Sequence, residues 1–101
     1  MPYYSVLAVT PVNEEWIPDY IEPANRLVKQ YGGKYLARTA AHEQLEGKTD
    51  EAALRILIEW PSKAAALGFM NDSQYQPHLR ARQAGSRSFH FLIEGKDDLA
   101  T

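Results

Sequence analysis

Residues 29–39 read KQYGGKYLART, and this stretch decides the fold. Two adjacent glycines, Gly32 and Gly33, end a helical pattern, and an alternating apolar run begins directly after them. Such a glycine pair is typical of a helix C-terminus, where a left-handed residue favours glycine. A phosphate-binding loop would need its glycines before a helix, not after one. The stretch therefore predicts a helix followed at once by a strand over KYLART, residues 34–39.

The residues before this stretch predict a strand and then the helix itself. Residues 3–10 are rich in aromatic and β-branched side chains, and Pro11 stops the run. Asn13 is the expected N-cap of the helix, and Pro18 fits into its first turn. Pro23 lies in the helix interior, where proline removes a backbone hydrogen bond. We therefore expect a kink or two helical pieces at Pro23.

The residues after it predict further strands and helices. HEQLEG, residues 42–47, is expected to form a short strand, and AALRILIEW, residues 52–60, is the most β-like run in the chain. Ser62 is expected to cap a short helix over residues 63–70. The S-x-x-Q pattern of residues 73–76 predicts a capping box that starts a second helical piece ending at Gly85. The last strand is expected over residues 86–95.

Apart from the short strand over residues 42–47, the order is βαββαβ, which predicts a ferredoxin-like α+β fold, an antiparallel sheet with helices on one face. A chain of 101 residues rarely holds two independent cores, so a single domain is expected, with a core over about residues 3–95 and a frayed C-terminal tail. The net charge of −2 gives no basic footprint for nucleic acid. The sequence contains no cysteine, no signal-peptide pattern and no apolar run that could span a membrane. A cytoplasmic protein with neither a nucleic-acid nor a membrane partner is expected.

The alternation of side chains along each strand assigns them to two faces. It places Leu54, Ile56, Ile58 and Trp60 on one face and Phe89, Phe91 and Ile93 together on one side of the last strand. The face without helices is expected to mix leucines with charged residues: Leu36, Leu57, Leu92, Arg38, Arg55, Glu59 and His90. A sheet face in water usually shows a cleaner polar pattern. The mixture therefore predicts contact with another layer, most simply a second copy in an isologous homodimer.

Several blocks of the sequence, in this order, resemble the domain of unknown function 1330 family: YGGKYLAR, EQLEG, LRILIEWPS, SQYQPHLRARQ and FHFLIEG. The resemblance covers about residues 3–95. That family belongs to the dimeric α+β barrel group of ferredoxin-like proteins, so the resemblance implies a homodimer whose two sheets face each other. It implies no particular activity. Trp60 stands where the family usually has Phe, and Arg38 is followed by TAAH where the family often has two glycines.

Five residues are the candidates for a site in a pocket between helix and sheet or between two sheets: Arg38, Arg55, Glu59, His90 and Glu94. His90 and Arg38 are the candidate catalytic residues, because an imidazole can act as acid or base near neutral pH and an arginine binds a carboxylate or enolate with two hydrogen bonds. The other three are candidate ligand-binding residues. One strand order would place Arg55 beside His90 and Arg38 near Glu94. Alternatively, the five residues form ion pairs inside the dimer interface.

Two other groups of residues are weaker candidates. His42 lies near Glu43 and Glu46, but the three histidines of the chain lack the spacing of metal ligands, so no metal and no cofactor is expected. A basic patch around the last helix comprises His78, Arg80, Arg82 and Arg87. This patch is either a solvated face or a surface that attracts an anionic substrate.

By analogy with the fold, the chain is expected to be a cofactor-independent enzyme of the monooxygenase, isomerase or lyase type that acts on a small organic acid or aromatic. The alternatives are a homodimer that binds a small molecule without turnover and a purely structural homodimer.

Overall fold

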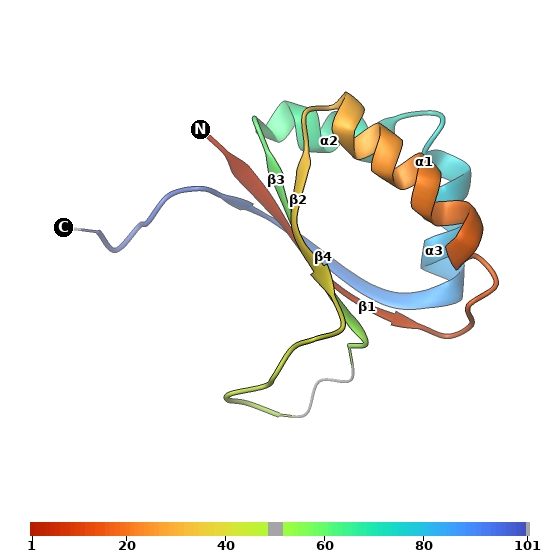
Figure 1. The fold of residues 1–101 in the computed structure, drawn as a ribbon. Coiled ribbons are helices and arrows are strands. Elements are labelled where there is room, and N and C mark those ends of the chain that lie inside the picture. The colour runs from red at the N-terminus through yellow and green to blue at the C-terminus, as the bar shows by residue number, and fades with distance from the viewer. Residues whose placement is uncertain (49–51, 101) are drawn as a thin grey trace.

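The computed structural model describes residues 1–48 and 52–100. This part of the chain forms a sheet and three helices (Figure 1). In chain order the elements are β1 (Tyr3–Pro11), α1 (Ile17–Gln30), β2 (Lys34–Thr39), β3 (Leu54–Trp60), α2 (Lys63–Asn71), α3 (Gln76–Gly85) and β4 (Ser86–Glu94). The strand order across the sheet is β2-β3-β1-β4, and each neighbouring pair is antiparallel. This is the predicted βαββαβ order, with the second helix of the pattern divided into α2 and α3.

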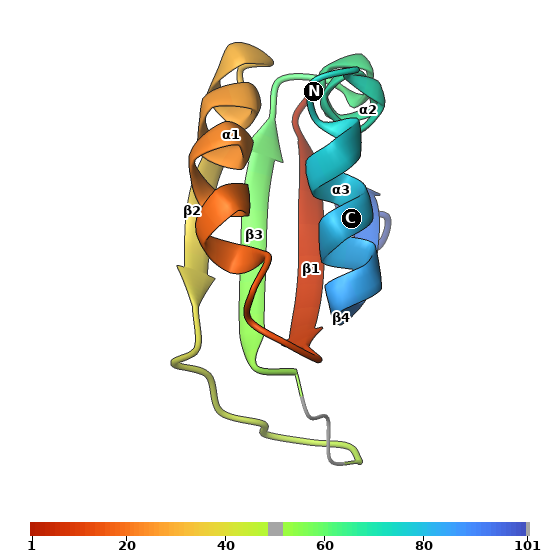
Figure 2. The ribbon, with the colours of Figure 1, turned by 90° about the vertical axis from the view of Figure 1, so that its right-hand side faces the viewer.

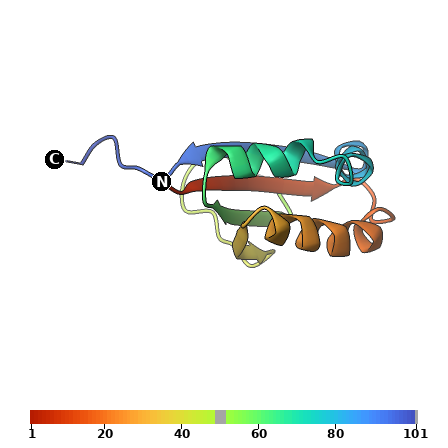
Figure 3. The ribbon, with the colours of Figure 1, turned by 90° about the horizontal axis from the view of Figure 1, so that it is seen from above.

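All three helices lie on the same face of the sheet, with α1 over β2 and β3 and α3 over β4 (Figures 2 and 3). The opposite face carries no helix in the described part of the chain. The fold is therefore the predicted ferredoxin-like α+β fold. None of these helices is long and apolar enough to cross a bilayer.

Helix α1 is one helix of 14 residues that contains Pro23, so of the two alternatives expected at Pro23, a kink or two helical pieces, the second is wrong. Pro18 lies in the first turn, as predicted. Residues Ala24, Leu27 and Val28 are fully buried directly after Pro23, and their packing offsets the missing backbone hydrogen bond. Gly32 has a φ of 77°, which confirms the left-handed residue expected at the end of this helix.

One of the three expected caps forms. The Ser62 hydroxyl accepts a hydrogen bond from the Ala65 N–H at 3.1 Å and caps α2. Asn13 does not cap α1, which begins at residue 17, and instead its Oδ1 accepts from the Glu15 N–H in the preceding turn. No side chain caps α3 in a capping box, because the Gln76 amide donates to the backbone oxygens of Met70 and Asp72.

The expected strand over residues 42–47 is absent, and these residues are exposed and irregular. The Gln44 side chain donates hydrogen bonds to the backbone oxygens of Glu46 (3.1 Å) and Lys48, and Gly47 has a φ of 93°. A local turn therefore replaces the strand, because these backbone groups find partners nearby rather than across a sheet.

The register of the sheet corrects the expected faces. Leu7 of β1 pairs with Ile56 of β3 and His90 of β4, so these side chains share the face under the helices. His90 is therefore not on the uncovered face, and Leu92, two residues along the strand, accompanies it. Phe89 and Phe91 instead point away from the helices and are each 66% exposed.

Strand β2 contains a bulge that moves Arg38 to the helix face as well. Tyr35 pairs with Ile58 and Arg38 pairs with Ile56, although the register shifts between Tyr35 and Ala37. The extra residue breaks strict alternation, so two residues separated by three positions share a face. The expectation that Arg38 lies on the uncovered face is wrong for this reason.

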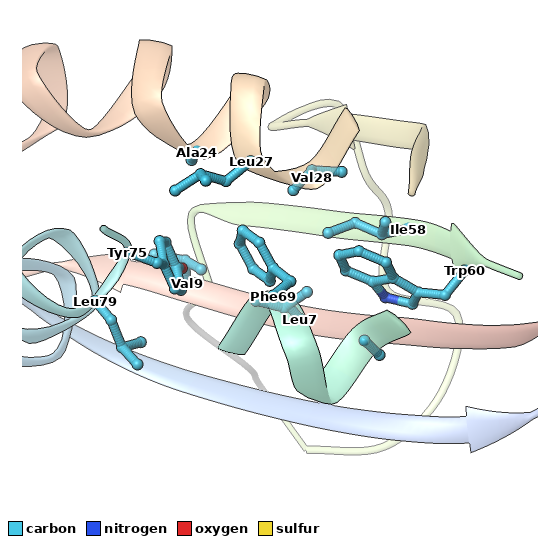
Figure 4. Close-up of a cluster of buried hydrophobic side chains, with 11 residues drawn as sticks. Leu7, Val9, Ala24, Leu27, Val28, Ile58, Trp60, Phe69, Tyr75 and Leu79 are labelled. Carbon is cyan, nitrogen blue, oxygen red and sulfur yellow. The ribbon is translucent and has the colours of Figure 1, made fainter. Parts of the chain in front are cut away.

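The core lies between the helices and the sheet (Figure 4). Trp60, Tyr75, Leu27 and Val28 are its largest fully buried side chains. The indole N–H of Trp60 donates to the Ser5 hydroxyl at 2.8 Å, and the ring packs against Phe69 with centroids 5.3 Å apart. Gly33 gives this ring room, since a Cβ at that position would lie 2.6 Å from it.

Candidate functional site

The sheet and the helices enclose a cavity of about 240 Å³. Most of its wall is apolar and comes from the helix face of the sheet and from α1: Leu7, Val9, Leu54, Ile56, Ile58, Ile17 and Ile21. Ile21 is 46% exposed and marks the side that opens to solvent. Hydrophobic walls with a few placed polar groups are the usual build of a small-molecule site.

Six polar side chains line this cavity, and they come from different elements: Tyr20, Tyr35, Arg38, Tyr75, Arg82 and His90. No aspartate or glutamate of the described ranges lines it. The packing of the helices on the sheet and the bulge in β2 bring these residues together, although they are far apart in the sequence. The polar part of the site thus consists of phenols, an imidazole and two guanidinium groups.

Tyr35 and Tyr75 remain protonated. The Tyr20 and Tyr75 hydroxyl oxygens are 2.5 Å apart and share a hydrogen bond. Burial raises the pKa of Tyr75 above its usual value of 10, and Tyr20 adds to this shift. Burial likewise raises the pKa of Tyr35, although the neighbouring Arg38 opposes it. Both phenols are therefore neutral near pH 7.

His90 is held in one hydrogen-bonded arrangement. Its Nε2 lies 2.8 Å from the Ser5 hydroxyl, which already accepts the Trp60 indole N–H. Ser5 is fully buried, and its own proton needs an acceptor. We infer that Ser5 donates to Nε2, which leaves the proton of the neutral ring on Nδ1.

Burial and, second, the positive charge of Arg82 lower the pKa of His90 from 6.5 to about 4. The ring is therefore neutral at pH 7. An anion bound beside it would favour the charged imidazolium, because an opposite charge raises the pKa of a histidine.

Arg82 is the most buried charged residue of the site, at 4% exposure. Its Nε has no hydrogen-bond partner within residues 1–48 and 52–100. The sequence grouped Arg82 with His78, Arg80 and Arg87 in a basic patch that was either a solvated face or a surface for an anionic substrate. Arg80 and Arg87 are exposed, whereas Arg82 is buried and does not belong to a solvated face. The helical spacing could have indicated this burial, because Arg82 lies three residues after the buried Leu79 and therefore on the inward side of α3.

Arg38 lies at the edge of the cavity and is exposed. Its guanidinium carbon is 3.9 Å from the centre of the Tyr35 ring, and its Nη1 donates to the Asn25 side-chain oxygen at 2.6 Å. The stacking and this hydrogen bond hold the guanidinium at the cavity rim.

The structure separates the five residues that the sequence grouped. Arg38 and His90 line the cavity between helices and sheet, whereas Arg55 and Glu59 lie on the opposite face. Arg55 pairs with Ala8, in the row of Phe89, so the strand order does not place it beside His90. On that face Glu59 accepts a hydrogen bond from the Tyr4 hydroxyl at 3.4 Å.

Glu94 lies near the end of β4, away from the cavity. It accepts a hydrogen bond from the Tyr3 hydroxyl at 3.1 Å and forms an ion pair with Lys96 at 3.4 Å. It is therefore not placed near Arg38.

The face without helices, called the bare face below, carries a shallow groove lined by Val6, Ala8, Ala37, Arg55, Leu57, Phe89 and Phe91. It exposes more apolar surface than the sequence indicated, because the two phenylalanines point outward. His42 lies at the margin of this groove. Within the described ranges, no three His, Cys, Asp or Glu side chains come together as metal ligands.

The model of the family described as "Domain of unknown function (DUF1330)" matches residues 2–96. No curated protein matches the chain.

Three solved structures are similar in fold. A protein of unknown function from Rhodopseudomonas palustris has a TM-score of 0.80 and 20% identity, covering 95% of this chain and 83% of that chain. A dimeric ferredoxin-like protein of unknown function from Jannaschia sp. CCS1 has a TM-score of 0.63 and 16% identity, covering 93% and 99%. SnoaB, a cofactor-independent oxygenase from Streptomyces nogalater, has a TM-score of 0.57 and 18% identity, covering 99% and 96%. At these identities the similarity shows the fold alone.

Proposed function

The chain belongs to the DUF1330 family, a family of unknown function, and we propose that its cavity binds a small organic acid or small aromatic molecule and transforms it without a cofactor. The observation that carries this proposal is the cavity itself, which combines apolar walls with polar side chains from several elements, most of them buried or partly buried. Such a combination is typical of sites that bind and orient a small molecule.

The reaction type is proposed from the fold and from the site together. SnoaB is a cofactor-independent oxygenase of similar fold, which supports a monooxygenase, isomerase or lyase without a cofactor. Cationic groups in a largely apolar site stabilise negative charge that develops on a substrate. Such a site therefore favours reactions that pass through an enolate or phenolate.

In this proposal His90 and Arg38 contact the bound molecule. The neutral imidazole of His90 donates a hydrogen bond or exchanges a proton with it, and Arg38 binds it at the rim. Arg55 and Glu59 lie on the bare face and contact the second copy rather than the ligand. Glu94 has no place at the cavity in this proposal.

The working assembly is a homodimer in which two bare faces meet. The bare face exposes Phe89 and Phe91 at 66% each, Ile93 at 48% and Val6 at 39%. A contiguous apolar patch of this kind marks an interaction surface. The ferredoxin-like protein from Jannaschia sp. CCS1 is dimeric, which supports the same arrangement here.

A glutamate at position 91 tests the dimer. Phe91→Glu places a charge in the centre of the proposed interface, so light scattering after size exclusion is expected to show a monomer. Leu67→Glu is the matched control, because Leu67 is an exposed apolar residue on α2 (44% exposed). An unchanged mass for both variants would refute a dimer through the bare face.

Native mass spectrometry of freshly purified protein tests the binding function. A small extra mass that disappears on denaturation is expected, and Ile21→Trp at the open side of the cavity should abolish it. Val12→Trp, at an exposed position (69%) that does not line the cavity, should retain it. Retention of the mass in Ile21→Trp would refute the cavity as its site.

Turnover is tested by incubating the protein with a panel of small aromatic and aliphatic acids, without added metal or cofactor. Loss of one compound and formation of its product, reduced in His90→Ala, supports the enzyme. Retention of a compound without product would instead show a binding protein.

A further inference from the structure

Arg82 is a buried cation without a counter-charge in the described part of the chain. It is 4% exposed, and it makes no ion pair with any described aspartate or glutamate. Its Nε–H is also without an acceptor among these residues. Buried charges in proteins are usually paired, and buried polar groups are usually hydrogen-bonded. An acceptor is therefore missing from the cavity that Arg82 lines.

The neighbouring groups do not supply this acceptor charge. The Tyr35 and Tyr75 phenols stay protonated, and the imidazole of His90 already uses Nε2 as the acceptor for Ser5. The positive charge of Arg82 acts on all three rings, since it lowers the pKa of His90 and opposes the rise at the two tyrosines. The cavity thus offers hydrogen-bond donors and a net positive charge.

We propose that Arg82 is the anion-recognition residue of the cavity and that the ligand is a small monocarboxylate with an apolar body. This rests on the proposed function, namely that the cavity binds a small molecule, and adds the charge and size of that molecule. The planar guanidinium matches a carboxylate, which accepts parallel hydrogen bonds from it. Most of the remaining wall is apolar, so it fits a ligand whose body is apolar.

The volume limits the size of the ligand. A cavity of about 150 Å³ accommodates benzene, with its six carbon atoms. In proportion, the 240 Å³ cavity holds a ligand of roughly ten non-hydrogen atoms. A single aromatic ring with a short acidic side chain has this size, whereas a fused polycyclic acid exceeds it.

Phenylacetate and phenylacetamide test this inference, because they have the same shape and differ in charge. Titration followed by backbone NMR shifts is expected to show the acid binding about ten- to a hundredfold more tightly than the amide to the wild-type protein. Arg82→Met should bring the two affinities within about threefold of each other. Arg80→Met, on the exposed side of the same helix, should keep the wild-type preference.

The unfolding temperature of the ligand-free protein gives a second measurement. Arg82→Met removes an unpaired buried charge, so the ligand-free variant is expected to unfold at a higher temperature than wild type. Arg82→Gln keeps a polar group and is the replacement if the methionine variant does not fold. Its preference for the acid should also disappear.

The outcomes separate the two proposals. Equal binding of acid and amide to the wild-type protein would overturn the role of Arg82 and leave the small-molecule site intact. Binding of neither compound at millimolar concentration, together with a lower unfolding temperature of Arg82→Met, would make Arg82 a structural residue and would count against both proposals.

Discussion

The partly buried ring of His90 is expected to make the protein less stable as the pH falls from about 6.5 to about 4. In the unfolded chain this histidine takes up a proton near its ordinary pKa of 6.5, whereas in the folded protein it stays neutral to about pH 4. The unfolded state therefore binds more protons in this window. Because stability rises with pH wherever the unfolded state binds more protons, the contribution of His90 is complete above about pH 6.5 and is lost as the pH falls.

The size of the effect follows from the two pKa values. The difference between 6.5 and about 4 corresponds to at most about 3 kcal/mol in the free energy of unfolding. The ring is only partly buried, so solvent screening reduces the expected amount to roughly 1–2 kcal/mol. His90→Gln removes this dependence while its amide oxygen can still accept the Ser5 hydroxyl proton.

Urea denaturation at pH 7 and at pH 4.5 measures the effect. The quantity of interest is the loss of unfolding free energy between the two pH values in wild type, minus the same loss in His90→Gln. This difference cancels the carboxylates that titrate in both proteins. His42→Gln, in the exposed segment before Gly47, is the control and should behave as wild type.

Equal losses in wild type and His90→Gln would refute the reasoning, because they would show that the ring is not held neutral in the fold. A larger loss in the variant would show that folding raises the pKa of His90 rather than lowering it. Either result would also remove His90 as the neutral hydrogen-bonding group of the cavity.

Three further substitutions test the packing and the caps, each by urea denaturation. Trp60→Phe is expected to lower the free energy of unfolding by about 1–3 kcal/mol, since it leaves a void and removes the donor to Ser5; an unchanged stability would mean that the site repacks freely. Gly33→Ala is expected to lower it by a similar amount, about 1–3 kcal/mol, because its Cβ would collide with the Trp60 ring. Ser62→Ala should lower it by about 1 kcal/mol through loss of the cap of α2. Ser73→Ala should leave the free energy of unfolding almost unchanged. A loss as large as that of Ser62→Ala would show that Ser73 does cap α3.

Most of the fold follows from local patterns in the sequence. The glycine pair after α1, the proline after β3 and the alternation within each strand act over a few residues, and these predict the order of the elements. The wrong prediction of a strand over residues 42–47 also has a local cause. A polar side chain, that of Gln44, satisfies the backbone there, and no alternation pattern reveals such a competing turn.

The site was less predictable because it depends on which face each strand presents. Alternation shows that Phe89 and His90 are on opposite sides of β4, but only the register with β1 decides which side meets the helices. For Arg38 the alternation itself is interrupted by the bulge. The prediction for Arg82 followed the usual exposure of arginine and not the helical spacing, which places this residue on the inward side of α3.

The bulge in β2 has a consequence for how this chain can diverge. The strand lies at an edge of the sheet, where a change of register disturbs a single neighbour. Loss of the bulge without loss of a residue would restore strict alternation between Tyr35 and Arg38, which are three positions apart, and would turn the Arg38 guanidinium out of the cavity while Tyr35 keeps its place. A shift in the register of one edge strand, rather than replacement of a side chain, is therefore a route by which descendants of this protein could exchange one ligand for another.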